Sequence, residues 1–303
     1  MSEIVLHEVG PRDGLQMEKE TVPLERKLAW IRTALAAGVD IVQVGSFVHP
    51  KLTQMADTDE LFRCLQEDGQ RPEGATLSGL VLNERGLERA LDCGCEMICT
   101  GVSASETHSR KNTRMSPAEA AERVIKLAGL AVEQKLQVQV SVQSAFGCGF
   151  DGEIPEAKVL ELVKRYLDAG LTSISLADTA GMANPEQVER LFGAIRELND
   201  TAKLACHLHN TYGLGLVNCQ AAMRAGVTCF ESAFGGLGGC PFTAVAGGNV
   251  CTEDFVHFLQ ALGHRPDIKL DRLIELTEDV AAFFGRQLPG AVYQALRKKE
   301  KSE

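Results

Sequence analysis

Short apolar runs recur along the chain, and a longer stretch with the periodicity of an amphipathic helix follows most of them. The runs are rich in β-branched residues and are too short to be buried helices. We expect eight strands, at residues 4–9, 40–45, 76–81, 97–102, 138–143, 173–176, 203–209 and 229–233. Helices are expected between them, among others at residues 23–37, 117–133, 156–169, 185–197 and 213–225.

Strands that alternate with helices form parallel sheets. Eight such units with no linker-like segment between them favour one (β/α)₈ TIM barrel over a doubly wound sheet. We therefore predict a single domain over residues 1–303, with the barrel at about 4–262, where residues 252–262 close the ring. An additional C-terminal helical segment is expected at about 263–298, with its main helix near 267–284.

The ends of several helices are marked by residues with known local preferences. Ser116 and Asn184 each precede a proline, which is typical of a capped helix start. Gly38, Gly170 and Gly226 stand between a predicted helix and the next strand, where a left-handed residue commonly ends a helix.

Composition and charge narrow the class of protein. The chain has 31 basic and 41 acidic residues and a net charge of −10, which argues against nucleic acid or an anionic membrane as a partner. No apolar run approaches the ~20 residues of a membrane span, and a strand begins too early for a signal peptide. We expect a cytoplasmic protein whose ten cysteines are reduced, and most of them, the cluster of Cys93, Cys95 and Cys99 included, are packing residues.

Polar residues stand where predicted strands end, which in a TIM barrel is the rim that carries the active site. Arg12 and Asp13 follow the first strand, and His207 and His209 close the seventh. Residues i and i+2 of a strand share a face, so both imidazoles can point at one position. With Asp13 they suit an octahedral divalent ion such as Mg²⁺ or Mn²⁺, and Asn249 can add an amide oxygen. A His-x-His pair alone can also be one ligand and one core histidine.

Other polar residues of the same rim are candidates for binding a substrate. Asp178 can either support a metal ligand or hold the substrate. The substrate-binding candidates are Arg12, Gln16, Gln43, Ser141, Gln143, Asp178 and Thr179.

A glycine-rich segment, Gly235-Gly236-Leu237-Gly238-Gly239-Cys240-Pro241, follows the last strand. Paired glycines allow a mobile loop and a close approach of the backbone to a ligand. One interpretation is a loop with a buried thiol; the other is a lid that carries Cys240 over the metal as an acid or base.

These motifs occur in the order seen in 3-hydroxy-3-methylglutaryl-CoA lyases, which the chain resembles from residue 4 to about residue 262. The resemblance is carried by Arg12-Asp13-Gly14-Leu15-Gln16, Ser46-Phe47-Val48, Ser103-Ala104-Ser105-Glu106, Asp178-Thr179, the segments 207–213 and 235–241, Gly248-Asn249 and Thr252-Glu253-Asp254.

The resemblance implies retro-Claisen cleavage of a 3-hydroxyacyl-CoA to an acyl-CoA and a keto acid. It implies a metal held by Asp13, His207, His209 and Asn249. Asp13 or His207 would remove the hydroxyl proton, Arg12 would stabilise the enolate, and Cys240 would help to move the proton that quenches it.

The sequence also departs from the family pattern. Gln43 replaces a usual Glu, Ser141 a usual Tyr, and Gln143-Ser144 a Ser-Cys pair, while Met17 and Asn210 replace Asn and Asp. The smaller Ser141 should enlarge the acyl pocket, which suggests a longer or differently branched 3-hydroxyacyl group.

Three alternatives stay open. The same site suits an aldolase acting on a hydroxy-keto acid without CoA, or a Claisen synthase, although synthases usually carry further C-terminal domains. The third is a barrel that binds metal or acyl-CoA without turnover, with Gln43 marking lost activity. The C-terminal helix is compatible with a homodimer.

Overall fold

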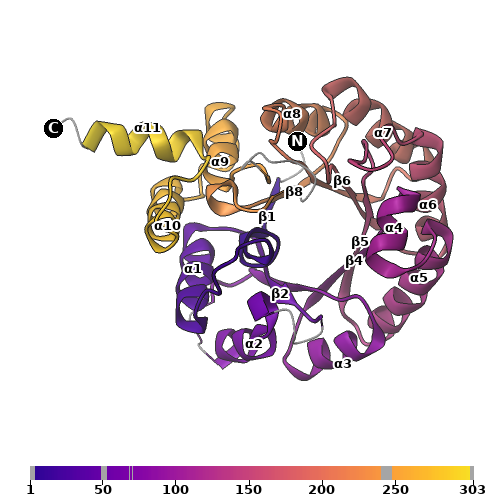
Figure 1. Cartoon of the computed structure of the whole chain (residues 1–303), viewed down its shortest axis with the longest axis horizontal. Coiled ribbons are helices and arrows are strands. Elements are labelled where there is room, and N and C mark those ends of the chain that lie inside the picture. The colour runs from indigo at the N-terminus through magenta and orange to yellow at the C-terminus, as the bar shows by residue number, and fades with distance from the viewer. Residues whose placement is uncertain (1–3, 49–52, 68, 70, 240–247, 301–303) are drawn as a thin grey trace.

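The computed structural model describes residues 4–48, 53–67, 69, 71–239 and 248–300. Within them, eight parallel strands close into a barrel in chain order, and β1 pairs with β8 (Figure 1). The predicted TIM barrel and the additional C-terminal helices are therefore confirmed.

The strands fall close to their predicted positions. Their bounds are β1 Val5–Glu8, β2 Ile41–Ser46, β3 Thr76–Leu80, β4 Met97–Ser103, β5 Gln137–Gln143, β6 Ser173–Ala177, β7 Lys203–His207 and β8 Cys229–Ser232. The expected extent of the seventh strand was too long. It ends at His207, and His209 instead forms an isolated antiparallel bridge with Asn249.

The helices surround the barrel. Their bounds are α1 Leu24–Ala37, α2 Thr58–Glu67, α3 Glu84–Asp92, α4 Glu106–Thr113, α5 Pro117–Glu133, α6 Glu156–Asp168, α7 Pro185–Leu198, α8 Gly215–Arg224, α9 Thr252–Ala261, α10 Leu270–Phe283 and α11 Ala291–Glu300. Three short helical turns accompany them, η1 Gly10–Gly14, η2 Thr53–Met55 and η3 Phe234–Gly236. The C-terminal segment thus contains two helices, and α11 extends away from the barrel (Figure 1).

The expected helix ends are present. Ser116 forms a capping box with Glu119 at the start of α5, and the Asn184 side chain accepts a hydrogen bond from the Gln187 backbone N–H. Gly38 ends α1 at a φ of 100°, a conformation that only glycine adopts without strain.

The two faces of the barrel strands differ in chemistry. Along β5, Val140 and Val142 pack into the core under the helices, while Gln139 on the opposite face reaches Glu231 of β8 across the barrel. His7 of β1 likewise contacts Ser78 of β3. Aliphatic layers usually fill a TIM barrel. The interior of this barrel is instead polar and buried, below the rim formed by the carboxyl ends of the strands.

The C-terminal helices fasten the end of the chain to its beginning. Asp279 of α10 pairs with Arg26 and accepts a hydrogen bond at 2.6 Å from the indole N–H of the buried Trp30, both on α1. Asp254, in the first turn of α9, accepts hydrogen bonds from the first two backbone N–H groups of α11.

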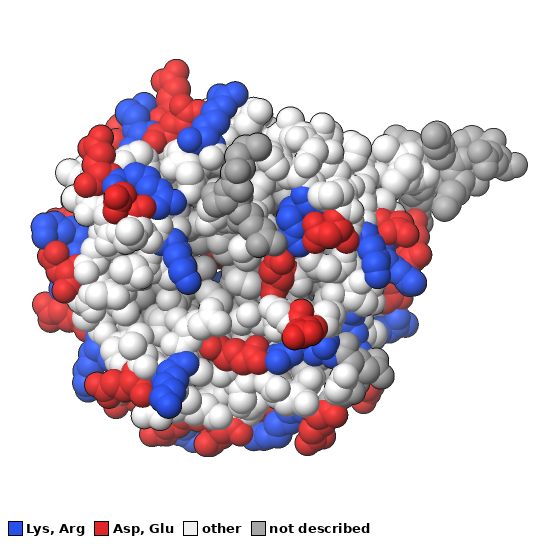
Figure 2. All heavy atoms as spheres, turned by 180° about the vertical axis from the view of Figure 1, so that it is seen from behind, with Lys and Arg blue, Asp and Glu red and all other residues white. Residues whose placement is uncertain are grey.

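The charges on the surface and the state of the cysteines agree with what the composition predicts. Among the described residues, no helix is long and apolar enough to cross a membrane. On the face that Figure 2 shows, acidic and basic side chains intermingle round the edge, and the described residues form no broad area of one sign. Nine cysteines of the described part have free thiols, and Cys93, Cys95 and Cys99 are buried as expected.

Candidate active site

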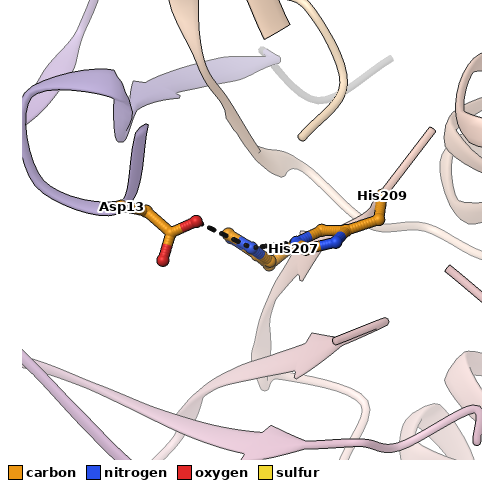
Figure 3. A group of neighbouring side chains, drawn as sticks. All are labelled: Asp13, His207 and His209. Atoms are coloured by element: carbon orange, nitrogen blue, oxygen red, sulfur yellow. Dashed lines mark hydrogen bonds and ion pairs between the residues drawn. The ribbon is translucent and has the colours of Figure 1, made fainter. Parts of the chain in front are cut away.

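The Arg-Asp motif is held on a single wide helical turn at the end of β1. The backbone N–H groups of Arg12, Asp13 and Gly14 all donate to the Val9 carbonyl, at 2.7 to 3.3 Å, and this turn is η1. Such π-type turns are rare and frequently occur at functional sites. The turn directs Asp13 toward the end of β7, as Figure 3 shows.

Asp13, His207 and His209 converge, and we call these three residues the metal cluster. One ligand atom from each lies within 4.8 Å of the others. The two Nε2 atoms are 3.1 Å apart, and His207 Nε2 lies 3.8 Å from Asp13 Oδ2 (Figure 3). The three residues that the sequence predicts to share one site therefore lie close together in the structure.

The chemistry of this donor set fits a divalent ion. Ligand atoms bonded at about 2.1 Å and at right angles lie about 3 Å from each other, which matches the separation of the two imidazole nitrogens. Burial, with repulsion from His207, lowers the pKa of His209 to about 3, so this imidazole is neutral and its nitrogen is available as a ligand. Two nitrogens and a carboxylate with open positions suit Mn²⁺ or Mg²⁺.

Asn249 reaches the metal cluster from the segment after the glycine-rich loop. Its Nδ2 donates to Asp13 Oδ2 at 2.8 Å and to the Leu237 carbonyl at 2.9 Å, while its buried Oδ1 has no partner among the described residues. The amide nitrogen rather than the oxygen thus faces Asp13. The predicted role as an oxygen ligand requires the amide to turn over, after which the unpartnered oxygen would face the cluster.

Arg12 is held between two neighbours. Its Nη1 pairs with Asp13 Oδ1 at 2.5 Å, and its Nε donates to the Gln43 side-chain oxygen. Burial alone would raise the pKa of Asp13, but the charges of Arg12 and His207 outweigh it and hold this pKa well below its usual range. Asp13 is therefore ionised, as a metal ligand must be.

A buried carboxylate that the motifs did not reveal supports His207. Glu231 Oε2 lies 3.0 Å from His207 Nδ1. Burial alone would lower the pKa of His207, but the hydrogen bond that its ring donates to Glu231 and the charge of Asp13 raise it. The signal was present, since Glu231 is an acidic residue in an apolar strand, but only the closed barrel shows what it contacts.

The remaining substrate-binding candidates lie in three places. Ser141 and Gln143 share the inner face of β5 with Gln139, and Ser141 Oγ donates weakly to the Thr100 carbonyl at 3.4 Å. Gln16 lies just beyond η1 and is exposed to solvent.

The side chains of Asp178 and Thr179 accept hydrogen bonds from the backbone of nearby segments. Asp178 Oδ1 accepts from the Met182 N–H at 2.8 Å, its Oδ2 is buried without a partner among the described residues, and burial raises its pKa to about 6. Thr179 Oγ1 accepts from the Ser144 N–H at 2.9 Å.

The base of the glycine-rich loop lies against the metal cluster. A Cβ added to Gly238 would stand 2.5 Å from Asn249 Nδ2 and 3.4 Å from an Asp13 carboxylate oxygen. Glu8 accepts a hydrogen bond from the Phe234 N–H, and Glu253 accepts one from the Gly235 N–H. Cys240 lies outside the described residues.

Comparison with known proteins identifies relatives over the whole chain. The model of the HMGL-like family matches residues 3–280. A hydroxymethylglutaryl-CoA lyase of Bacillus subtilis, YngG, is 34% identical over 97% of both chains. An (R)-citramalyl-CoA lyase of Chloroflexus aurantiacus is 36% identical over 97% of this chain and 95% of its own. These relatives are carbon–carbon lyases, which confirms the expected enzyme class.

Solved structures give the same result. The Bacillus subtilis HMG-CoA lyase matches with a TM-score of 0.92 and 34% identity, over 98% of this chain and 99% of its own. An HMG-CoA lyase of Acinetobacter baumannii, solved with coenzyme A and 3-methylmalate, matches with a TM-score of 0.89 and 38% identity, over 97% of this chain and 95% of its own. On these matches, and on the motifs that the barrel assembles, the chain belongs to the HMGL-like family.

Proposed function

We propose that this chain is a divalent-metal-dependent lyase that cleaves a 3-hydroxyacyl-CoA to an acyl-CoA and a keto acid. The observation that carries the proposal is the meeting of Asp13, His207 and His209 beside Arg12 at the carboxyl ends of the strands. A 3-hydroxyacyl-CoA with a carboxylate on the same fragment as its hydroxyl offers two oxygens to a metal and a thioester oxygen to a cation.

Each residue of the site has its own role in the proposed reaction. Asp13, His207 and His209 would hold Mg²⁺ or Mn²⁺, and the bound ion would supply Lewis-acid polarisation and orientation of the substrate oxygens. A base removes the 3-hydroxyl proton, and the O–H electron pair becomes part of the new carbonyl of the keto acid. Asp13 and His207 are the two candidates; because Nδ1 of His207 faces Glu231, its Nε2 could accept the proton only where that atom is not bound to the metal.

Cleavage of the C2–C3 bond then places its electron pair on C2 and the thioester oxygen. The Arg12 guanidinium, already held by Asp13 and Gln43, is positioned to stabilise that enolate oxygen. A proton added to C2 completes the acyl-CoA, so one proton is removed and one is returned. Delivery of this proton by Cys240 stays a prediction from the sequence.

The acyl group is the open part of the proposal. The relatives include lyases named for hydroxymethylglutaryl-CoA and for citramalyl-CoA, which differ in the length of the chain between thioester and carboxylate. Ser141 is a small residue on the inner face of β5, close to the rim. A serine at this position, in place of the larger Tyr of the family pattern, supports a pocket that accepts a larger acyl group beside β5.

The test is a turnover assay on the metal-free protein after restoration of Mg²⁺ or Mn²⁺. Formation of the acyl-CoA product is followed chromatographically with 3-hydroxy-3-methylglutaryl-CoA, citramalyl-CoA and longer or branched 3-hydroxyacyl-CoAs. We expect metal-dependent cleavage of at least one of these thioesters and none after chelation. Activity that survives chelation would overturn the metal role. In a parallel assay that follows keto-acid release, cleavage only of CoA-free hydroxy-keto acids would favour an aldolase.

Ser141→Tyr tests the size of the pocket. We expect this variant to lose larger substrates while keeping smaller ones, with a change in KM greater than the change in kcat. An unchanged preference would mean that Ser141 does not line the acyl pocket.

A further inference from the structure

A buried carboxylate stands beside the metal cluster, on β8, the strand that pairs with both β1 and β7. Glu231 of β8 is only 8% exposed. Its Oε1 accepts hydrogen bonds from Gln139 Nε2 at 2.6 Å and from Ser175 Oγ at 3.0 Å, and its Oε2 lies 3.0 Å from His207 Nδ1. These contacts come from β5, β6 and β7, so Glu231 is held from three sides.

The partners of Glu231 determine which nitrogen of His207 carries the proton. An ionised carboxylate has only acceptor atoms, and the Gln139 amide and the Ser175 hydroxyl both donate to it. The contact with His207 is a hydrogen bond only if Nδ1 carries the hydrogen. In a neutral imidazole the lone pair is then on Nε2, the atom that faces His209 and Asp13.

We propose that Glu231 is a positioning residue, which fixes the proton of His207 on Nδ1 and keeps the Nε2 lone pair directed at the metal position. The proposal rests on the proposed metal-dependent function. It applies whether Nε2 binds the metal or accepts the substrate proton, because both roles need an unprotonated Nε2 at the same place.

The second imidazole of the cluster lacks such a support. His209 Nδ1 is buried and has no hydrogen-bond partner among the described residues. Among the described residues, a carboxylate therefore holds the Nδ1 of only one of the two histidines. This asymmetry makes Glu231 the group on which the orientation of the pair depends.

The free energy needed to bury the Glu231 carboxylate supports a role for this residue beyond packing. A buried carboxylate must be desolvated, and aliphatic residues fill the same layers of most TIM barrels without that cost. Three hydrogen-bonding partners from three strands are present to offset it. Carboxylates that hold metal-binding histidines in this way typically contribute 10- to 100-fold in metal affinity.

The tautomer is measured by ¹⁵N NMR of the histidine side chains in the metal-free protein, with the His207 signals assigned from a His207→Asn variant. We expect the wild type to show a proton on Nδ1. In Glu231→Gln the side-chain amide can either donate to Nδ1 or accept from it, so we expect a mixture of tautomers. The same Nδ1 tautomer in both proteins would overturn the proposal.

Metal affinity is measured on the same proteins by the EPR signal of free Mn²⁺. We expect Glu231→Gln to bind Mn²⁺ about 10- to 100-fold more weakly than the wild type. Ser78→Ala is the matched control, since it removes a buried hydrogen bond to His7 inside the same barrel without touching His207. We expect it to bind Mn²⁺ as the wild type does.

The outcomes separate this inference from the proposed function. A wild type that does not bind Mn²⁺ refutes the metal site itself. A wild type that binds, with Glu231→Gln equally tight, refutes only the role of Glu231. If Glu231→Gln does not fold, Ser175→Ala removes one donor that holds Glu231, and we expect a smaller loss of Mn²⁺ affinity in the same direction.

Discussion

Asn249 donates a hydrogen bond to Asp13 across 236 positions of sequence, at 2.8 Å. This contact joins the turn after β1 to the segment that follows the glycine-rich loop. The second hydrogen of the same amide binds the Leu237 carbonyl at 2.9 Å. One side chain therefore links the metal cluster to the base of the loop, and changes that move either segment should affect both.

Gly248→Ala should break this link. The added Cβ would lie 1.9 Å from the Gly238 carbonyl oxygen and 2.4 Å from its carbon, and these are backbone atoms that cannot rotate away. We expect the two segments to separate at a cost of about 1–3 kcal/mol in unfolding free energy. Urea denaturation measures this loss, and weaker Mn²⁺ binding should accompany it.

Gly193→Ala is the control for that substitution. Gly193 lies inside α7, and nothing stands within 4 Å of a Cβ added there. Alanine is the better helix former, so we expect a gain of roughly 0.5–1 kcal/mol and unchanged metal binding. Equal stability of the Gly248→Ala variant and the wild type would show that the two segments can move apart freely.

Most of the fold and the centre of the site could be predicted from the sequence, because both depend on regular patterns. Period-two and helical periodicities give the alternation of strands and helices, and barrel closure places strand ends on one rim. Asp13 and His207 could be brought together on that rule alone, with no knowledge of distances.

What could not be predicted depends on irregular backbone and on contacts across the barrel. The wide turn η1 and the early end of β7 leave no periodic signal in the sequence. Glu231 occupies an inward position that an aliphatic residue usually fills, and its contact with His207 depends on the register between the neighbouring strands β7 and β8. The orientation of the Asn249 amide likewise depends on its partners.

Arg12→Gln should abolish most of the turnover while the protein stays folded. The substitution removes the cation expected to stabilise the enolate, and loss of one such donor typically lowers kcat by about 10²- to 10³-fold. It also removes the ion pair that lowers the pKa of Asp13. Steady-state kinetics with the best substrate of the panel measures the effect.

Arg12→Lys serves as the comparison. Lysine keeps the charge but cannot bind Asp13 and Gln43 with two fixed nitrogens. We expect activity between those of the wild type and Arg12→Gln. If Arg12→Gln turned over as fast as the wild type, the guanidinium would have no part in the chemistry.

Glu8→Gln should change how stability depends on pH. Glu8 is fully buried at the end of β1, where burial raises its pKa from 4.5 to about 7 although Thr252 and two backbone N–H groups donate to it. The folded state therefore holds the proton more tightly than the unfolded chain. The resulting contribution to stability is complete below about pH 4.5 and is lost as the pH rises through about 7.

Glutamine does not titrate, so the variant should keep this contribution at high pH. From pH 5 to pH 8 we expect the wild type to lose more unfolding free energy than Glu8→Gln, by on the order of 3 kcal/mol. Glu253, whose burial raises its pKa to about 8, titrates in both proteins, and since the charge of Glu8 is the smallest contribution to that pKa, most of its effect cancels in the difference. Urea denaturation of both proteins across this range measures the difference, and parallel pH profiles would show that Glu8 keeps one protonation state throughout.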